Sequence, residues 1–286
     1  MEKNYQVLAR KYRPQKFSEV VGQPVLIQTL SNAIKNNRIA HAFILTGIRG
    51  IGKTSTARII AKSLNCVGAD GNGKETIDIC GVCPHCIGIA NSTDADVIEF
   101  DAASHTGVDD IRDIIDTISY APIASRYKIY IIDEVHMLSK SAFNALLKTL
   151  EEPPPYVKFI FATTEINKVP ITILSRCQRF DLRRLTFEEI KEHLKNISSK
   201  EGFEAEDGAL SLLASASEGS VRDSLSLLDT AFSHNNYEKL LTEKVVFDML
   251  GLSSKNEIFD LIENMLTGNF EGTINKFNEI QLYHLI

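Results

Sequence analysis

Residues 47–54 read Gly47-Ile48-Arg49-Gly50-Ile51-Gly52-Lys53-Thr54, which fits the pattern G-x-x-x-x-G-K-T. An apolar, strand-like run precedes this stretch at 42–45, and a run with helical spacing follows it at 55–62. A glycine-rich turn between a buried strand and a helix N-terminus lets backbone N–H groups close around phosphates, and the helix dipole favours their negative charge. The sequence therefore predicts a phosphate-binding loop, and we expect a nucleotide to lie against residues 47–54 and Ser55.

Two side chains of this loop and two carboxylates further along the chain fit nucleotide hydrolysis. We expect Lys53 to contact the β- and γ-phosphates of ATP and the Thr54 hydroxyl to bind Mg²⁺. Residues 127–132 form an apolar run that ends in Asp133 and Glu134, at the sheet edge where ligands bind in α/β proteins. Asp133 is expected to complete the Mg²⁺ shell, and Glu134 to act as general base toward the attacking water.

Strand and helix patterns alternate through the first two thirds of the chain. Apolar, strand-like runs occur at 43–46, 97–101, 128–133, 157–163 and 178–182. Helical spacing occurs at 24–37, 53–65, 107–119 and 139–151. This alternation predicts an α/β domain with a five-stranded parallel sheet and helices on both faces.

From about residue 184 onward we expect no strands. Helical patterns follow at 186–201, 206–217, 220–233 and 242–250, and residues 254–286 are again amphipathic. Thr186 and Glu189 stand at the spacing of a capping box, in which a hydroxyl and an acid cap one helix N-terminus reciprocally. The sequence thus predicts three parts: an α/β domain at 1–183, a small all-α domain at 184–252 and a further helical part at 253–286.

Four of the five cysteines share short spacings: Cys66, Cys80, Cys83 and Cys86. In a chain without a secretion signal, such a cluster favours a metal over disulfides. Four thiolates suit a structural Zn²⁺ and leave no open position for catalysis. His85 lies inside the cluster and is an alternative ligand, while an iron–sulfur cluster or unliganded thiols are alternative interpretations. We expect a zinc-binding insertion at about 66–96, and we expect Cys177 to be a packed thiol.

Composition sets further bounds. Hydrophobic residues make up 44% and charged residues 24% of the chain, values ordinary for a globular protein. The net charge of −6 argues against a mainly basic DNA-binding surface without excluding a local one. No apolar run approaches the ~20 residues that span a bilayer, and residues 1–5 begin no signal peptide. A cytoplasmic protein is therefore expected.

Further stretches stand in a characteristic order along the chain. They are residues 5–14 (YQVLARKYRP), 20–23 (VVGQ), 133–139 (DEVHMLS), 149–154 (TLEEPP) and 175–177 (SRC). With the phosphate loop and the four-cysteine insertion, they resemble the AAA+ ATPases and, within these, the gamma/tau subunits of the bacterial DNA polymerase III clamp loader. The resemblance covers about residues 3–252. The remainder resembles only the start of that family's third, collar-forming helical domain.

The resemblance implies roles that spacing alone does not. Arg176 would act in trans as an arginine finger on ATP held by a neighbouring subunit, because its fixed charge can meet the γ-phosphate in the transition state. Arg222 would be the lid-domain arginine that touches the γ-phosphate in cis. Thr164 would be the polar strand-end residue beside the attacking water. The adenine pocket would be lined by Arg13, Pro14, Val20 and Val21.

The resemblance also implies an ATPase subunit whose cofactors are ATP, Mg²⁺ and Zn²⁺. ATP binding and hydrolysis would drive loading of a sliding clamp onto primed DNA, while polymerisation belongs to another subunit. The expected partners are the other subunits of a hetero-oligomeric ring, the clamp, and DNA phosphates contacted without sequence preference. Residues 104–107 and 139–141 would face the DNA, although His105 and Gly107 stand where relatives often carry basic residues.

Other interpretations remain open at this stage. One is a different AAA+ ATPase, such as a Holliday-junction motor or an initiator. Another is a nucleotide-locked scaffold that never hydrolyses ATP, although Lys53, Asp133 and Glu134 are intact. A third is a truncated remnant unable to assemble, because the C-terminal end lacks a capping or turn signal and looks like a helix cut short.

Overall fold

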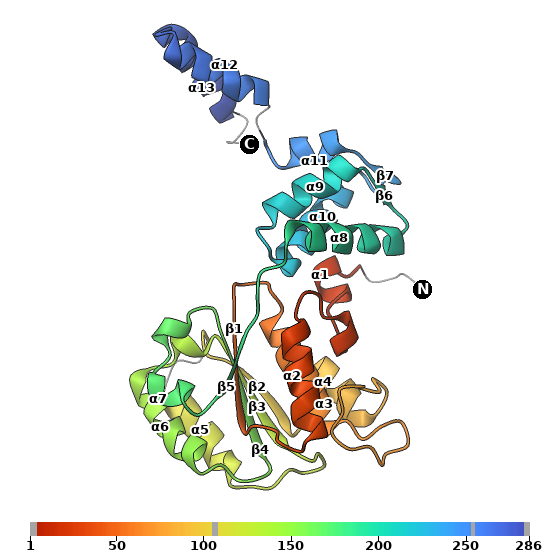
Figure 1. The fold of residues 1–286 in the computed structure, drawn as a ribbon, viewed down its shortest axis with the longest axis vertical. Coiled ribbons are helices and arrows are strands. Elements are labelled where there is room, and N and C mark those ends of the chain that lie inside the picture. The colour runs from red at the N-terminus through yellow and green to blue at the C-terminus, as the bar shows by residue number, and fades with distance from the viewer. Residues whose placement is uncertain (1–4, 105–107, 253–254, 283–286) are drawn as a thin grey trace. The chain divides into compact units, whose positions relative to one another are not determined.

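The computed structural model describes residues 5–104, 108–252 and 255–282. The chain forms two compact units, and each is described by itself (Figure 1). The first comprises Met1–Glu189 together with Gly219–Asp223, and the second comprises Ile190–Glu218 and Ser224–Ile286. Among the described residues, no helix is both long enough and apolar enough to cross a membrane.

A five-stranded, all-parallel sheet forms the centre of the first unit. Its strands are β1 (Ala42–Thr46), β2 (Val97–Asp101), β3 (Lys128–Asp133), β4 (Val157–Thr163) and β5 (Gln178–Asp181). They lie in the order β2-β3-β4-β1-β5. Every residue of β1 and β4 is buried, as expected for strands covered on both faces. The five predicted strands are confirmed, with bounds that differ by at most one residue.

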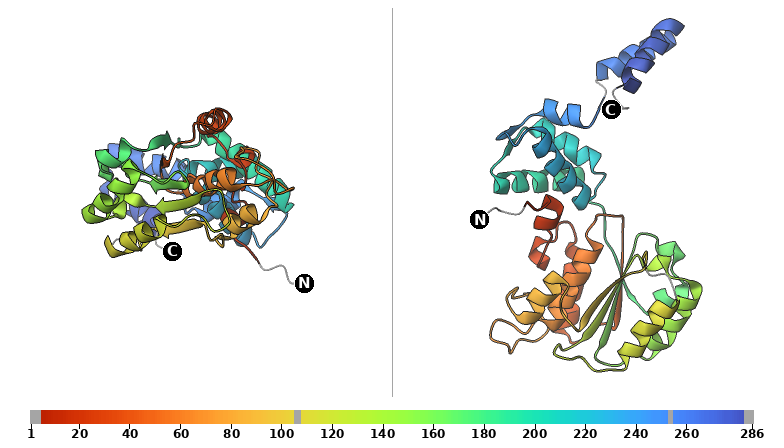
Figure 2. Two further views of the ribbon diagram at one scale, coloured as in Figure 1. Left: turned by 90° about the horizontal axis from the view of Figure 1, so that it is seen from below. Right: turned by 180° about the vertical axis from the view of Figure 1, so that it is seen from behind.

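Helices cover both faces of this sheet (Figures 1 and 2). On one side lie α2 (Pro24–Lys35), α3 (Lys53–Asn65) and α4 (Pro84–Asn91). On the other lie α5 (Val108–Ile118), α6 (Lys140–Glu151) and α7 (Ile171–Leu174). The apolar face of α6, with Phe143 and Leu146, packs against Tyr130 of β3 and Phe159 of β4 in the main core.

Short elements complete the first unit. They are the helix α1 (Leu8–Lys11) and the 3₁₀ helices η1 (Phe17–Glu19), η2 (Val135–Met137) and η3 (Ile166–Lys168). The predicted capping box is confirmed, because Thr186 N donates to Glu189 Oε2 at 2.9 Å and Glu189 N donates to Thr186 Oγ1 at 3.3 Å. A hydrogen bond from Arg183 and the N–H of Thr186 lower the pKa of Glu189 to about 2.

The second unit is helical, with α8 (Phe187–Glu201) beginning in the first unit. It continues with α9 (Asp207–Ala216), α10 (Val221–His234) and α11 (Glu243–Met249). It also contains a two-residue parallel ladder of β6 (Glu204–Ala205) and β7 (Leu240–Leu241), which the sequence pattern did not predict because two residues show no periodicity. Beyond it, α12 (Lys255–Leu266) and α13 (Phe270–Leu282) pack on each other. Gly268 has φ +71° in the turn between them.

Candidate functional site

The predicted phosphate loop joins the end of β1 to the start of α3. Gly52 caps α3 with φ +100°, and Gly50 has φ +75°; both values lie where side chains other than glycine are strained. A Cβ at Gly50 would also collide with the Ser220 side chain, whereas nothing lies within 4 Å of a Cβ at Gly52. The loop is therefore held in a curved, glycine-dependent conformation at a helix N-terminus, which suits an anion.

Lys53 is the buried cation of this loop, with only 5% of its surface exposed. Its Nζ donates to the carbonyl oxygens of Gly47 at 3.0 Å and Ile48 at 3.1 Å. Burial lowers the pKa of Lys53, and the nearby Glu134 and Asp133 carboxylates oppose that shift. The ammonium thus lies inside the loop. Its N–H groups could donate to phosphate oxygens in place of these carbonyl oxygens.

Thr54 and Asp133 meet although they are 79 positions apart in the sequence. The Thr54 hydroxyl donates directly to Asp133 Oδ2, and Asp133 Oδ1 accepts from the Glu134 N–H at 2.9 Å. A hydroxyl and a carboxylate are the oxygen donors that Mg²⁺ takes in proteins. The residues present therefore fit the predicted Mg²⁺ site beside the lysine.

Glu134 follows β3 with a left-handed backbone, φ +45°. Its Oε2 accepts from Thr164 N at 3.3 Å and from Thr164 Oγ1 at 3.1 Å. These residues approach because β3 and β4 are neighbours and both strands end at the same sheet edge. The proposed base and the proposed strand-end threonine are therefore in direct contact.

A segment from far along the sequence also lies at the loop. Gly219–Asp223 belongs to the same compact unit as the sheet, and the Arg222 N–H donates to the Gly50 carbonyl at 3.1 Å. A Cβ on Gly50 would lie 3.2 Å from the Arg222 Cβ. The structure thus brings the backbone of Arg222 to the phosphate loop.

The residues expected at an adenine ring lie between α1 and α2. Arg13 Nε donates to Ser55 Oγ at 2.9 Å, so its head group lies beside the first turn of α3. Burial lowers the pKa of Arg13, as does the nearby Arg58, while Glu99 and Asp133 oppose the shift. The other three residues that we expect at the adenine ring are half-buried: Pro14, Val20 and Val21. Their contact with adenine stays a prediction.

Arg176 lies just after α7, and its contacts are local. Its guanidinium donates to Thr172 O at 2.7 Å, to Ser175 Oγ at 3.2 Å and to Glu151 Oε1 at 2.6 Å. About a third of the side chain, 32%, is exposed. None of these hydrogen bonds reaches residues 47–55 of the same chain. The head group is thus ordered at the surface, which suits a role toward another molecule.

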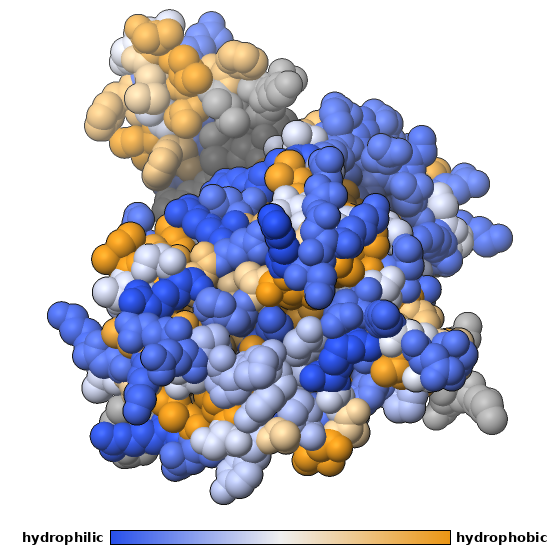
Figure 3. Space-filling view, turned by 60° about the horizontal axis from the view of Figure 1, so that its bottom comes forward, coloured by the Kyte–Doolittle hydropathy of each residue, from blue (hydrophilic) through white to orange (hydrophobic). Residues whose placement is uncertain are grey.

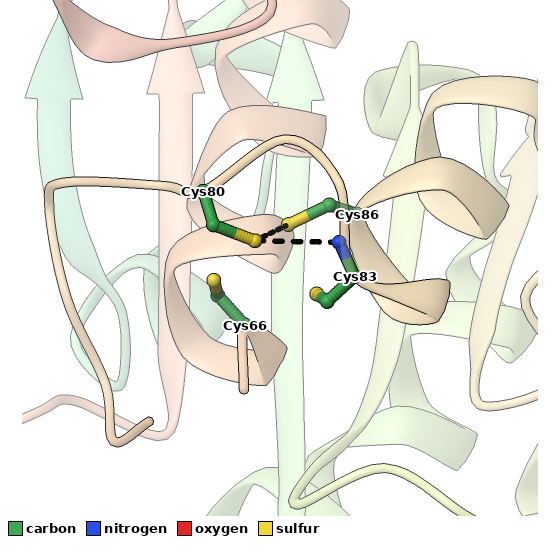
Figure 4. A group of neighbouring side chains, drawn as sticks. All are labelled: Cys66, Cys80, Cys83 and Cys86. Atoms are coloured by element: carbon green, nitrogen blue, oxygen red, sulfur yellow. Dashed lines mark hydrogen bonds between the residues drawn. The ribbon is translucent and has the colours of Figure 1, made fainter. Parts of the chain in front are cut away.

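The four clustered cysteines converge (Figure 4). Cys66 ends α3, Cys83 caps α4, Cys86 lies in α4, and Cys80 comes from the loop between these helices. All four Sγ atoms lie within 4.8 Å of one another, and Cys80 Sγ is 3.9 Å from Cys86 Sγ. A tetrahedral Zn²⁺ with Zn–S bonds of about 2.3 Å needs sulfurs about 3.8 Å apart. The donor set therefore fits zinc.

The environment of these thiols is uneven. Burial raises the pKa values of Cys66 and Cys86. Burial also opposes ionisation of Cys80, but N–H groups of Val82 and Cys83 point at its sulfur and lower its pKa to about 6. His85 is engaged elsewhere, since its Nδ1 lies 3.1 Å from Asp94 Oδ2 and 3.0 Å from Ser125 Oγ. Among the described residues, the four thiols and not His85 form the metal-type cluster.

The remaining expectations concern packing and DNA. Burial raises the pKa of the Cys177 thiol to about 12, as expected for a packed cysteine. Residues 105–107 of the expected DNA-facing stretch lie outside the described residues. Ser139 caps α6, because its hydroxyl accepts from Ala142 N at 3.2 Å. A structural role therefore accounts for Ser139 without DNA.

Sequence analysis assigned no role to two polar residues of this region. One is His136, although it stands in the quoted stretch 133–139; its position two residues after Glu134 was the available signal. The other is Glu151, which holds Arg176 across two helices. No local pattern predicts that pair, because it depends on how α6 and α7 pack.

Comparison with known proteins identifies similar families. The family described as "DNA polymerase III, delta subunit" matches residues 22–186. The "DNA polymerase III clamp loader subunit, ATPase lid domain" matches residues 189–236. Among solved structures, the Holliday junction branch migration motor RuvB of Thermotoga maritima superposes with a TM-score of 0.62, covering 89% of this chain and 79% of that one at 20% identity. At that identity the likeness shows the fold alone.

Curated relatives are much more similar in sequence. The chain is 49% identical over 268 residues to DNA polymerase III subunit tau/gamma of Haemophilus influenzae, covering 94% of this chain and 38% of that protein. It is 48% identical to subunit tau of Escherichia coli, covering 96% and 42%. It is 46% identical to subunit gamma of Buchnera aphidicola from Acyrthosiphon pisum, covering 97% and 75%. The chain thus spans about two fifths of the first two relatives.

Proposed function

The chain belongs to the family of DNA polymerase III gamma and tau subunits, and from this we propose that it is an ATPase subunit of a clamp loader. In this proposal ATP binding and hydrolysis drive loading of a sliding clamp onto primed DNA. The alternative of an unrelated AAA+ motor has less support, because the likeness to RuvB is one of fold at 20% identity.

One observation carries the ATPase proposal: five predicted side chains and the backbone of Arg222 converge at the carboxyl edge of the sheet. Lys53 lies within the loop, Thr54 contacts Asp133, Glu134 contacts Thr164, and the backbone of Arg222 contacts the loop. They come from α3, from the ends of β3 and β4 and the residues that directly follow them, and from the 219–223 segment. Such a set is needed for phosphoryl transfer to water, where positioning and charge stabilisation supply most of the catalysis.

Each group then has a distinct task. Lys53 and the loop N–H groups bind the phosphates of ATP. The side chain of Arg222 approaches the γ-phosphate in cis. Thr54 and Asp133 hold Mg²⁺, which when bound neutralises charge developing on the phosphates. Glu134 accepts the proton of the attacking water, and Thr164 lies beside that water, in contact with the Glu134 carboxylate. The adenine ring of ATP is lined by Arg13, Pro14, Val20 and Val21.

The proposal extends to assembly with other subunits. Arg176 acts in trans on a neighbour's ATP, which is supported by its ordered, part-exposed head group. The four cysteines hold one structural Zn²⁺ in a module at about 66–96. DNA is bound through phosphates, so its affinity falls as salt rises. The protein works in the cytoplasm, where it meets the clamp and primed DNA.

We assign residues 1–183 to the nucleotide-binding domain, 184–252 to the lid and 253–286 to a collar-type helical part. The helix pair α12–α13 supports the last assignment, because it exposes many apolar side chains at the upper left of Figure 3. They include Phe259, Met265, Leu266, Phe270 and Phe277, each more than half exposed. Apolar surface on that scale suits an interface between subunits.

Two substitutions test the activity. Lys53→Ala should abolish ATP binding, because it removes the buried cation of the loop. Glu134→Gln should keep ATP binding and block hydrolysis, because it preserves shape and removes the base. Binding is measured by titration with a fluorescent ATP analogue, and hydrolysis by phosphate release in an assembly with partner subunits, with and without clamp and primed DNA.

Matched controls are Lys35→Ala and Glu152→Gln, which change exposed residues at the ends of α2 and α6. Both should behave as wild type. Hydrolysis by Glu134→Gln at the wild-type rate would refute the base assignment. A wild-type chain that binds ATP and never hydrolyses it in the assembly would support a nucleotide-locked scaffold instead.

A further inference from the structure

His136 stands apart from the groups assigned above. It lies in η2, two residues after Glu134, and its side chain is only 6% exposed. Its Nδ1 is 3.0 Å from Thr163 Oγ1 and 3.5 Å from Glu134 Oε2, and its Nε2 is 3.5 Å from Glu165 Oε1. The imidazole thus lies between two carboxylates, one of which is the proposed base.

We propose that His136 is a positioning residue for hydrolysis, which holds the Glu134 carboxylate in orientation and ties it to the end of β4. This inference rests on the proposed function, because it concerns the same site. It adds a residue to which sequence analysis gave no role.

The hydrogen bonds around the ring explain how it can orient the base. Thr163 is fully buried at the end of β4, and its Oγ1 accepts from Glu165 N at 3.0 Å, which fixes the hydroxyl beside His136. Among the described residues, the contacts of the Glu134 carboxylate fall on Oε2, from Thr164 and from the ring. Oε1 is thereby left to accept a proton from water.

A purely structural role would not need this side chain. A buried imidazole between carboxylates costs free energy to desolvate, and an apolar side chain of similar volume is often at least as stabilising. Glu134 itself is 29% exposed, and among the described residues its carboxylate is held from Thr164 on one side and by the ring on the other. Fixing a general base in one orientation is worth a large factor in rate.

The contact with Glu165 extends the network toward the surface. Glu165 also pairs with Lys168 at 2.8 Å, and its segment continues through η3 and α7 to Arg176. The side chain of Glu165 is 48% exposed, so its ion pairs are weakened by water and salt. We therefore expect the Thr163 and Glu134 side of the ring to matter more for hydrolysis than the Glu165 side.

Three variants of the full chain test the proposal in the assembly used for hydrolysis. His136→Leu removes both ring nitrogens and should lower kcat about tenfold or more, with KM and ATP affinity within about twofold of wild type. His136→Asn places an amide N–H near the position of Nδ1 and should recover most of the rate. Thr163→Val, which keeps shape and removes the hydroxyl, should lower kcat in the same direction as His136→Leu.

The matched control is His41→Leu, a substitution of another half-buried histidine at the opposite end of the sheet, just before β1. It should leave kcat unchanged. If circular dichroism shows that His136→Leu does not fold, the test rests on His136→Asn and Thr163→Val. A wild-type kcat in Thr163→Val together with an inactive His136→Asn overturns the proposal.

Wild-type kcat in His136→Leu also overturns it, as does a loss confined to KM. These results are distinguishable from failure of the proposed function. A wild-type chain without hydrolysis refutes the activity and this inference together, whereas a hydrolysing wild type with indifferent His136 and Thr163 variants refutes this inference alone.

Discussion

Asp96 illustrates how one buried carboxylate organises a loop. The residue is 1% exposed and precedes β2. Its two oxygens accept from the N–H groups of Ile123, Ala124 and Ser125 at 2.7, 2.8 and 2.7 Å. Burial raises the pKa of Asp96, but the three N–H donors outweigh it, so the pKa lies below its ordinary value. The carboxylate thus anchors the turn that leads into β3.

This anchor yields a stability prediction. Asp96→Asn should lower the free energy of unfolding by about 1–3 kcal/mol near pH 7, because charge-assisted hydrogen bonds are lost and an amide NH₂ faces N–H donors. Urea unfolding followed by circular dichroism measures the change. Asp116→Asn, on the exposed side of α5, is the control and should change stability by less than about 0.5 kcal/mol.

The effect should depend on pH with a defined sign. Because the pKa of Asp96 is lower in the folded chain than in the unfolded chain, the unfolded chain binds the proton first as pH falls. The stabilisation that Asp96 contributes is complete above the pKa of this carboxyl in the unfolded chain, about 3.9, and is lost as the pH falls below that value. The difference between wild type and Asp96→Asn should therefore shrink below about pH 4, and a constant difference would contradict the assignment.

At the scale of elements, the cysteine module joins two helices that serve different parts of the fold. Cys66 ends α3, whose first turn carries Lys53 and Thr54, and Cys83 and Cys86 begin α4. Metal at the far end of α3 would hold α4 against it, and these two helices do pack together. The module can thus support α3 without taking part in phosphate binding.

We predict one Zn²⁺ per chain and loss of that zinc in Cys86→Ser, because three thiolates bind less tightly than four. Elemental analysis of protein purified without chelator measures the content, and hydrogen exchange should show loosening of residues 66–96 after chelation. ATP affinity should change little, since the cluster lies at the opposite end of α3. Cys177→Ala is the control and should keep its zinc; wild-type protein without zinc would refute the site.

At the scale of the whole molecule, we expect Arg176 to act on a neighbouring subunit. Within the chain it pairs with Glu151, which is 51% exposed, and a pair so open to water contributes at most about 1 kcal/mol. The guanidinium can therefore leave Glu151 for a phosphate at small cost. If Arg176 acts in trans, its effect on turnover should therefore depend on assembly.

We predict that Arg176→Ala changes turnover by less than about twofold in dilute chain that sedimentation shows to be monomeric, and by about 10³-fold or more in an assembly with partner subunits. Phosphate release in both states gives the two ratios. The control is Arg179→Ala, an exposed arginine nearby with its own partner, Asp181. A large loss in the monomer would place Arg176 in its own chain's site and contradict the role in trans.

The sequence by itself determined the local pieces of this protein. The five strands and the helix after the phosphate loop follow from apolar runs, and residues 47–54 fix a glycine-dependent turn between them. The four thiols could be grouped because three of them are close in the sequence. Local periodicity and turn chemistry are properties of neighbouring residues, so they can be interpreted without knowing the fold.

Tertiary structure alone decided what meets at the sheet edge. The order β2-β3-β4-β1-β5 puts β4 between the loop strand and the Asp133 strand, and so brings Thr164 to Glu134 and His136 to Thr163. Local sequence patterns also gave no sign of the approach of the 219–223 segment to Gly50, the contact of Arg13 with Ser55 or the short ladder in the second unit. Only the family resemblance had pointed Arg222 and Arg13 toward the nucleotide. Such contacts depend on strand order and on loop closure between distant segments. Many small packing energies together decide both, so no single stretch of sequence encodes these contacts.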